Sequence, residues 1–272
     1  GNSALNFLVG QYSTAVGDEA GRYATGSYNT FVGNSAGKGS TSAPYASGDR
    51  NTVVGYNALG NFTTGYRNVA IGDRAGSQIT TGNSGVYIGY LAGYGGNQGG
   101  NVAIGAEALF TANSNSNVAI GYQAGRYTTA NDGVWIGVGA GSSKAGGGQS
   151  VLVGHYAGQY MVGSEATHVG RSAGQYASGS RNTFVGGNAG RGGTTSAPYS
   201  SGESNVGVGY NSQYNFTTGN ENVSLGHSTL FNNAIGTRNT AIGHRALVGS
   251  SGNSTSENVA VGRESLLSIS SG

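Results

Sequence analysis

A five-residue motif, Asn-Val-Ala-Ile-Gly, recurs along the chain and limits its possible folds more than any other feature. It occupies 68–72, 101–105 and 117–121, and in each case Ala-Gly or Ala-Leu follows after two intervening residues. The commonest step between motifs is about 16 residues, which is shorter than leucine-rich or helical repeats and fits one β-coil per repeat. Variants of the motif end at Gly17, Gly33, Gly55, Gly89, Gly137, Gly154, Gly170, Gly186, Gly209, Gly226, Gly243 and Gly262.

Each motif has the properties of a short strand followed by a turn. Side chains alternate along a strand, so Val69 and Ile71 share one face and Ala70 points to the other. Gly72 ends the strand, where a bend favours glycine. The asparagine that precedes each strand is expected to stack on its neighbours and form a hydrogen-bonded ladder. These asparagines are Asn29, Asn51, Asn68, Asn101, Asn117, Asn182, Asn205, Asn222, Asn239 and Asn258.

Composition supports a solenoid over other glycine-rich structures. The 272 residues include 54 glycines, and only 9% are charged, against about 7% Gly and roughly 25% charged residues in ordinary domains. Disorder normally requires a high net charge, but the chain carries +2. Collagen is excluded because glycine does not occupy every third position. We therefore predict an all-β fold, a parallel β-roll or β-helix solenoid of short coils, built as one repeat domain over residues 1–272.

A larger duplication overlies the coils. The block at about 20–76 is repeated at about 173–230, including an insertion at 38–49 that returns at 191–203. Each insertion displays Ser-Ala-Pro-Tyr, and loops that project from a rigid scaffold commonly carry binding residues. A loop that packs over a seam between coils explains the duplication equally well.

Several partners and cofactors are excluded or unexpected. A net charge of +2 provides no electrostatic footprint for nucleic acid. The chain has no apolar run of about 18 residues, so we expect no direct membrane insertion. It has no cysteine, which excludes disulfides and thiolate metal sites. We expect no cofactor.

The segment Asn239-Thr240-Ala241-Ile242-Gly243 and its relatives along the chain resemble the head repeats of YadA-like trimeric adhesins and the Asn-x-Ala-Ile-Gly repeats of phage-type tail fibres. This resemblance implies a homotrimer of left-handed parallel β-rolls that binds molecules on a cell surface. The repeat step here is longer than the typical adhesin head repeat.

An independent argument also favours a trimer. Both faces of each strand carry apolar residues, and a thin coil can bury only one of them. The other face must be covered or remain an exposed patch, and a closed three-fold assembly would cover it. The sequence leaves open which face lies inside.

Tyrosine is the most informative residue type for binding, because its ring has an apolar body and a polar tip. We predict ligand contacts from tyrosines after the strand-ending glycine, from Trp135, and from the two insertions. The tyrosines are Tyr56, Tyr90, Tyr122 and Tyr210, and the insertion residues are Pro44, Tyr45, Pro198 and Tyr199. Tyrosines that cover a coil edge or a seam between protomers are an equally good explanation.

No catalytic constellation is visible in the sequence. The acidic residues fall mostly in turns, although a pair of carboxylates across neighbouring coils could still cleave a glycan. His168 occupies the middle position of a strand. If that face lined a three-fold axis, three imidazoles could hold a metal, but a packed, hydrogen-bonded histidine is the simpler interpretation, and we predict no metal.

The sequence therefore predicts an extracellular head of a trimeric fibre or adhesin, on a cell surface or a virion tail fibre, and not an enzyme. Its expected partner is a cell-surface glycan or protein, bound for attachment to a bacterial or host cell. A glycan-degrading tailspike and a passive fibre shaft are the alternatives.

Overall fold

The structure, a computed structural model, describes residue 4 and residues 10–41, 45–96, 99–111, 114–143, 148–195, 199–249 and 255–267. These residues contain fifteen strands of three residues each and no helix, so the predicted all-β class is confirmed. The chain divides into two units, Gly1–Asp132 and Gly133–Gly272. The two copies of the duplicated block fall in different units.

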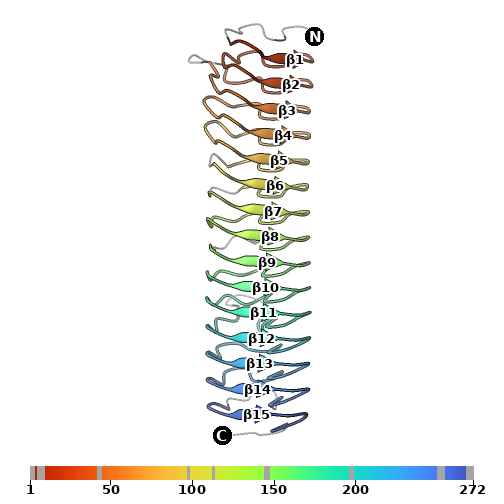
Figure 1. Ribbon diagram of the computed structural model, residues 1–272, viewed down its shortest axis with the longest axis vertical. Coiled ribbons are helices and arrows are strands. Elements are labelled where there is room, and N and C mark those ends of the chain that lie inside the picture. The colour runs from red at the N-terminus through yellow and green to blue at the C-terminus, as the bar shows by residue number, and fades with distance from the viewer. Residues whose placement is uncertain are drawn as a thin grey trace. The chain divides into compact units, whose positions relative to one another are not determined.

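The first unit contains seven strands, each paired in parallel with the next one along the chain. The register is continuous, as in the pair Val102 to Val118 and Ile104 to Ile120. The strands stack in sequence order (Figure 1). They are β1 (Thr14–Val16), β2 (Thr30–Val32), β3 (Thr52–Val54), β4 (Val69–Ile71), β5 (Val86–Ile88), β6 (Val102–Ile104) and β7 (Val118–Ile120).

The second unit repeats this arrangement with eight strands. Neighbouring strands again pair in parallel, for example Val223 with Thr240 and Leu225 with Ile242. Each unit is thus a parallel β-solenoid with one strand per coil, as predicted. The strands are β8 (Val134–Ile136), β9 (Val151–Val153), β10 (Thr167–Val169), β11 (Thr183–Val185), β12 (Val206–Val208), β13 (Val223–Leu225), β14 (Thr240–Ile242) and β15 (Val259–Val261).

The middle residue of each strand points into the coil, and the two flanking residues point outward. Phe31, Leu152 and Phe184 are fully buried, whereas Ile71 and Leu225 on the other face are exposed. This settles which face forms the core. The flanking Val, Ile, Leu and Thr residues form an outward face that nothing within a unit covers.

The coil interior is thin, so a large middle residue leaves no room for a side chain six positions later. A Cβ at Gly37 would overlap the Phe31 ring of the same coil. Leucine takes the position equivalent to Gly37 only where the middle residue is smaller, as Leu109 does in the coil of Ala103. Every aromatic middle residue accompanies glycine at that position, because the two side chains would compete for the same volume.

The strand-ending glycine allows neighbouring coils to approach closely. These glycines have φ between 118° and 140°, a region that residues with a Cβ rarely adopt. A Cβ at Gly105 would lie 2.5 Å from the carbonyl oxygen of Gly121 in the next coil. The predicted role of glycine is confirmed, and stacking adds a second reason for it.

The predicted asparagine ladder is also confirmed. In the second unit it runs without interruption from Asn182 to Asn258. At each step, backbone and side-chain amides donate to Oδ1 of the preceding asparagine, as Asn205 does to Asn182 at 2.9 and 3.2 Å. Gly85 replaces the asparagine in the coil of Tyr87, because a Cβ there would overlap the Tyr87 ring.

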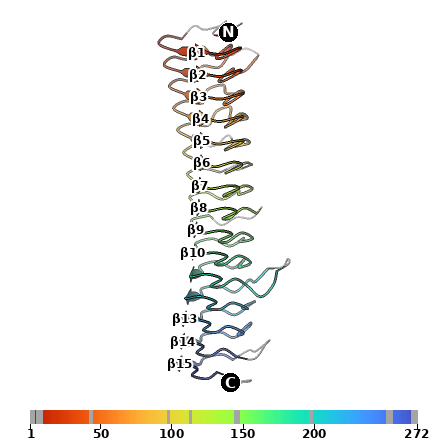
Figure 2. The same cartoon turned by 90° about the vertical axis from the view of Figure 1, so that its right-hand side faces the viewer.

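Each insertion leaves its coil and then rejoins the stack. Isolated parallel bridges join Ala24 to Ala46 in the first unit and Ala177 to Ser200 in the second. The coil between β11 and β12 extends farther from the strands than its neighbours do (Figure 2).

Candidate receptor-contact surfaces

The tyrosines after the strand-ending glycine are open to solvent. Tyr56, Tyr90 and Tyr122 in the first unit are 51%, 47% and 51% exposed, and Tyr210 in the second unit is 50% exposed. Each tyrosine comes two positions after the last outward-facing residue of its strand, so its ring lies beside the outward face. The structure makes these side chains accessible to a ligand, and their role in binding stays a prediction.

The prediction for Trp135 is wrong. Its side chain is 1% exposed and fills the coil interior, because Trp135 is the middle residue of β8. A Cβ at Gly133 or at Gly141 would overlap the indole ring. Two glycines therefore make room for the ring, and no surface ligand can reach it.

The insertion tyrosines pack against the body of the coil. Tyr45 stacks on Tyr23 with ring centroids 5.8 Å apart. Tyr199 packs on Tyr160 and Tyr176 at 5.2 and 6.0 Å. Both insertion tyrosines are half-buried, so they anchor their loops as well as presenting one ring edge. Pro44 and Pro198 lie outside the described residues.

His168 cannot hold a metal on a three-fold axis. It is the middle residue of β10 and is fully buried, so copies in other protomers cannot meet it. Its ring stacks on Phe184 at 5.2 Å, and neither ring nitrogen has a hydrogen-bond partner. The expectation of a packed histidine is correct, but the expectation that it is hydrogen-bonded is wrong. Within the described ranges, no group of three or more metal-ligating side chains occurs.

Burial of His168 makes the free energy of unfolding depend on pH. Burial lowers the pKa of the imidazole from 6.5 to about 3. Between these values the unfolded chain binds a proton that the folded chain does not, so stability falls as pH falls. The slope is at most about 1.4 kcal/mol per pH unit. We expect His168→Leu to reduce this slope in urea unfolding between pH 7 and pH 4, and exposed His244→Gln to retain it. An unchanged slope in His168→Leu would contradict the assignment.

A ridge of flat side chains runs along another edge of the second unit. Tyr160 and Tyr176 stack at 5.2 Å, and the Arg191 guanidinium lies 5.1 Å from Tyr176 and 5.4 Å from Tyr214. Tyr214 then stacks on Phe231 at 5.1 Å. Tyrosines on successive coils are thus aligned here. All five side chains are half-buried, so the ridge packs along the stack and is only partly open to a ligand.

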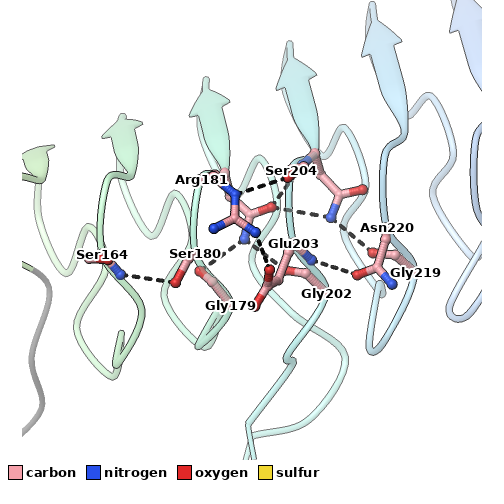
Figure 3. A network of polar contacts seen from close by, with 11 residues as sticks. Ser164, Gly179, Ser180, Arg181, Gly202, Glu203, Ser204, Gly219 and Asn220 are labelled. Carbon is pink, nitrogen blue, oxygen red and sulfur yellow. Dashed lines mark hydrogen bonds and ion pairs between the residues drawn. The ribbon is translucent and has the colours of Figure 1, made fainter.

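A polar network surrounds Arg181 on the turns that precede β11, β12 and β13 (Figure 3). Arg181 forms an ion pair with Glu203 at 2.5 Å and donates to Oγ of Ser204 at 3.3 Å. The backbone amide of Glu203 donates to Oδ1 of Asn220 at 2.7 Å. These side chains border a hollow of about 390 Å³, which is lined by Arg181, Ser201, Glu203, Ser204, Thr218, Asn220 and Glu221. Its hydroxyl, amide and carboxylate groups suit a ligand that is rich in hydroxyls.

The corresponding turns of the first unit carry exposed side chains that the sequence analysis missed. Tyr12, Tyr28 and Tyr66 are 75%, 52% and 41% exposed, and Arg50 and Arg67 lie among them. These residues belong to no repeated motif. Aligning the coils on the asparagine that precedes each strand would have placed these residues at one edge of the stack.

The described residues contain no helix with the length and apolar character of a membrane span. Compared with known proteins, the chain matches no family model, no curated protein and no solved structure.

Proposed function

We propose that the chain is the head of a homotrimeric fibre or adhesin that attaches to a bacterial or host cell by binding a surface receptor, most simply a glycan. The proposal places it outside the cell, on a cell surface or on a virion tail fibre. The observation that carries the proposal is the uncovered outward face of the strands. The left-handed course of the coils follows from the resemblance to adhesin and tail-fibre repeats.

The outward face is apolar throughout both units. The third residue of every described strand is Val, Ile or Leu, and the first is Val or Thr. Several of these side chains are well exposed in the single chain, among them Val223 at 42% and Leu225 at 49%. Soluble monomers rarely leave a long contiguous apolar patch uncovered. Three chains around one axis would bury the same face of each copy in a closed assembly.

Receptor binding is supported by the rings that remain exposed beside this face. Tyr56, Tyr90, Tyr122 and Tyr210 present large, rigid and amphipathic contact area with little conformational entropy to lose. In a trimer each site would be present three times. Weak individual sites then sum to strong attachment, because each later contact forms at a high effective concentration.

Binding of the full chain to whole cells and to arrays of surface glycans tests the proposal. We expect saturable binding that weakens at least tenfold when Tyr56, Tyr90 and Tyr122 are all replaced by serine, because rigid aromatic contacts dominate such surfaces. A matched control replaces Tyr23, which packs under Tyr45, with phenylalanine. An absence of binding across many cell types and glycans would support a passive shaft instead.

A glycan-degrading enzyme is the second candidate, since Glu203 and Glu221 line one hollow. The two residues lie on neighbouring coils, and the backbone amide of Glu221 donates to the carbonyl of Glu203 at 3.0 Å. Such an enzyme needs one carboxyl in its protonated form as the general acid. The Glu203 carboxylate is instead paired with the Arg181 guanidinium. Release of oligosaccharides from surface polysaccharide, lost in Glu203→Gln, would support the enzyme.

A further inference from the structure

Five exposed side chains form a strip along one edge of the first unit: Tyr12, Tyr28, Arg50, Tyr66 and Arg67. We call this set the tyrosine–arginine strip. The backbone amide of Tyr28 donates to the carbonyl of Gln11, that of Arg50 to Ser27 and that of Arg67 to Asp49, at 2.9–3.0 Å. These bonds hold successive turns in register, so the side chains follow one another along the stack.

Neighbouring flat groups of the strip lie close to one another. The rings of Tyr12 and Tyr28 have centroids 5.1 Å apart and planes inclined by 15°. The Arg50 guanidinium lies 5.3 Å from the Tyr28 ring, and that of Arg67 lies 5.6 Å from the Tyr66 ring. Along four successive coils the strip thus presents two rings, then a cation, and then a ring and a cation in the last coil.

Folding does not require these side chains. Tyr12, Tyr28, Arg50 and Arg67 have φ of 56–59°, a left-handed conformation that costs a residue with a Cβ roughly 1–2 kcal/mol. Elsewhere in the unit the same position carries Gly100 or small polar residues such as Ser84 and Ser116. Because coils without the strip have the same left-handed residue here, as at Ser84 and Ser116, the fold does not require a ring or a guanidinium at this position.

The second copy of the duplicated block provides an internal comparison. The ladder residues Asn29 and Asn68 are retained as Asn182 and Asn222, and the backbone keeps its register. The strip itself is not retained. The side chains equivalent to Tyr28, Arg50, Tyr66 and Arg67 are Arg181, Ser204, Asn220 and Glu221. The coil therefore forms without the strip, and the two copies present different charges and shapes at the same edge.

The charge of the strip indicates the kind of ligand. Within the part of the chain that the structure describes, neither Arg50 nor Arg67 forms an ion pair. The one nearby carboxylate, Asp49, accepts a hydrogen bond from the backbone amide of Ser27 at 2.7 Å. Guanidinium groups bind carboxylates through paired, charge-assisted hydrogen bonds, while exposed tyrosine rings provide flat apolar surfaces for sugar rings.

We propose that the tyrosine–arginine strip binds an acidic polysaccharide, with Arg50 and Arg67 on its carboxylates and the tyrosines against its sugar rings. This inference rests on the proposed function, because it names the class of receptor that the head recognises. Its extent along four coils fits a linear chain of several sugars better than a single small molecule.

The test compares polygalacturonate with its methyl ester, which has the same sugars without the charge, and with polyphosphate, which has charge without sugars. The full chain is immobilised and binding is measured at fixed salt. We expect polygalacturonate to bind at least tenfold more tightly than either of the other two polymers, since charged hydrogen bonds and ring contacts both contribute.

Variants taken from the second copy keep the fold while removing the strip. Arg50→Ser combined with Arg67→Glu should weaken binding of polygalacturonate by tenfold or more, and Tyr28→Ser combined with Tyr66→Asn should weaken it severalfold. Gln78→Ala, at an exposed turn position of the same unit outside the strip, is the matched control and should leave this binding unchanged. Circular dichroism of each variant confirms that the β-structure is retained.

Three outcomes would overturn the inference. The first is equal binding by wild type and the arginine variant. The second is polyphosphate binding as tight as that of polygalacturonate, with no effect of the tyrosine variant, which would indicate charge attraction alone. The third is undiminished attachment of the arginine variant to cells, which would leave the proposed function in place and reject only this site. Failure of the wild-type chain to attach to any cell or glycan would instead reject the proposed function.

Discussion

Replacing Gly93 with leucine is expected to unfold the coil that contains β5, and the further substitution Tyr87→Ala is expected to restore it. A Cβ at Gly93 would overlap the Tyr87 ring, and the tightly packed interior offers no room for either group to move. The left-handed backbone does not itself forbid leucine, because Leu109 occupies the equivalent position with φ of 49°. Leu109 fits because its coil has Ala103 in place of the tyrosine.

The single and double variants are expected to differ measurably in their free energy of unfolding. Gly93→Leu should cost about 3 kcal/mol through overpacking, and Tyr87→Ala should cost roughly 3–5 kcal/mol through the cavity that it leaves. The double variant should recover most of this loss, because leucine fills the space left by the ring. Adding Gly85→Asn should recover more, since the three atoms nearest to a Cβ at Gly85 all belong to the Tyr87 side chain and asparagine would close the gap in the ladder.

Urea unfolding of the full chain, followed by circular dichroism at one fixed protein concentration, measures these changes. Fixed concentration matters because association shifts apparent stability. If the double variant were no more stable than the less stable single variant, the proposed competition between positions 87 and 93 for the same space would be wrong.

The substitution Asn222→Asp is expected to destabilise the second unit by about 3–5 kcal/mol, as an uncompensated buried charge does. The Asn222 side chain is buried. Its Nδ2 donates to Oδ1 of Asn205 at 3.0 Å and to the carbonyl of Gly236 at 2.8 Å. Aspartate would place a carboxylate oxygen against these two acceptors. The backbone and side-chain amides of Asn239 donate to Oδ1 of Asn222, both at 3.0 Å. Aspartate can accept these two hydrogen bonds as well, but they cannot offset the repulsion.

A matched control lies two residues away. Asn220 is less buried, and its Oδ1 accepts a hydrogen bond from the backbone of Glu203, a role that aspartate can also perform. Asn220→Asp should therefore change the free energy of unfolding by less than about 1 kcal/mol. Hydrogen exchange should show faster opening of the coils around β12 to β14 in Asn222→Asp alone. Equal effects of the two substitutions would show that the ladder contributes little.

The regular features of the fold could be predicted from the sequence because they recur in every coil. Strand positions, the glycine after each strand and the stacking of Asn205 on Asn182 all follow from the period of the repeat. The inward face could not be predicted from periodicity, since Val69 and Ala70 are both apolar. The sizes of neighbouring residues do mark the inward face, because the large side chain of Tyr87 occurs together with Gly85 and Gly93, which leave room for it.

The candidate surfaces were less predictable, because not all of their residues belong to the repeated motif. Tyrosines that follow the motif, such as Tyr56 and Tyr90, were found because the motif marks their position. Trp135 was assigned to a surface because it is aromatic, although its neighbours Gly133 and Gly141 make room for it inside. Tyr28 and Tyr66 were missed because they occur in only one copy of the duplicated block, and only the aligned backbone shows that they share an edge.

The most direct test of the central claim is the mass of the intact chain in solution, measured by light scattering coupled to size exclusion. One chain has a mass of 27.1 kDa. The uncovered apolar face, represented by Val223 and Leu225, predicts a particle of three times this mass at micromolar concentration. A stable, soluble monomer at that concentration would contradict the trimeric head.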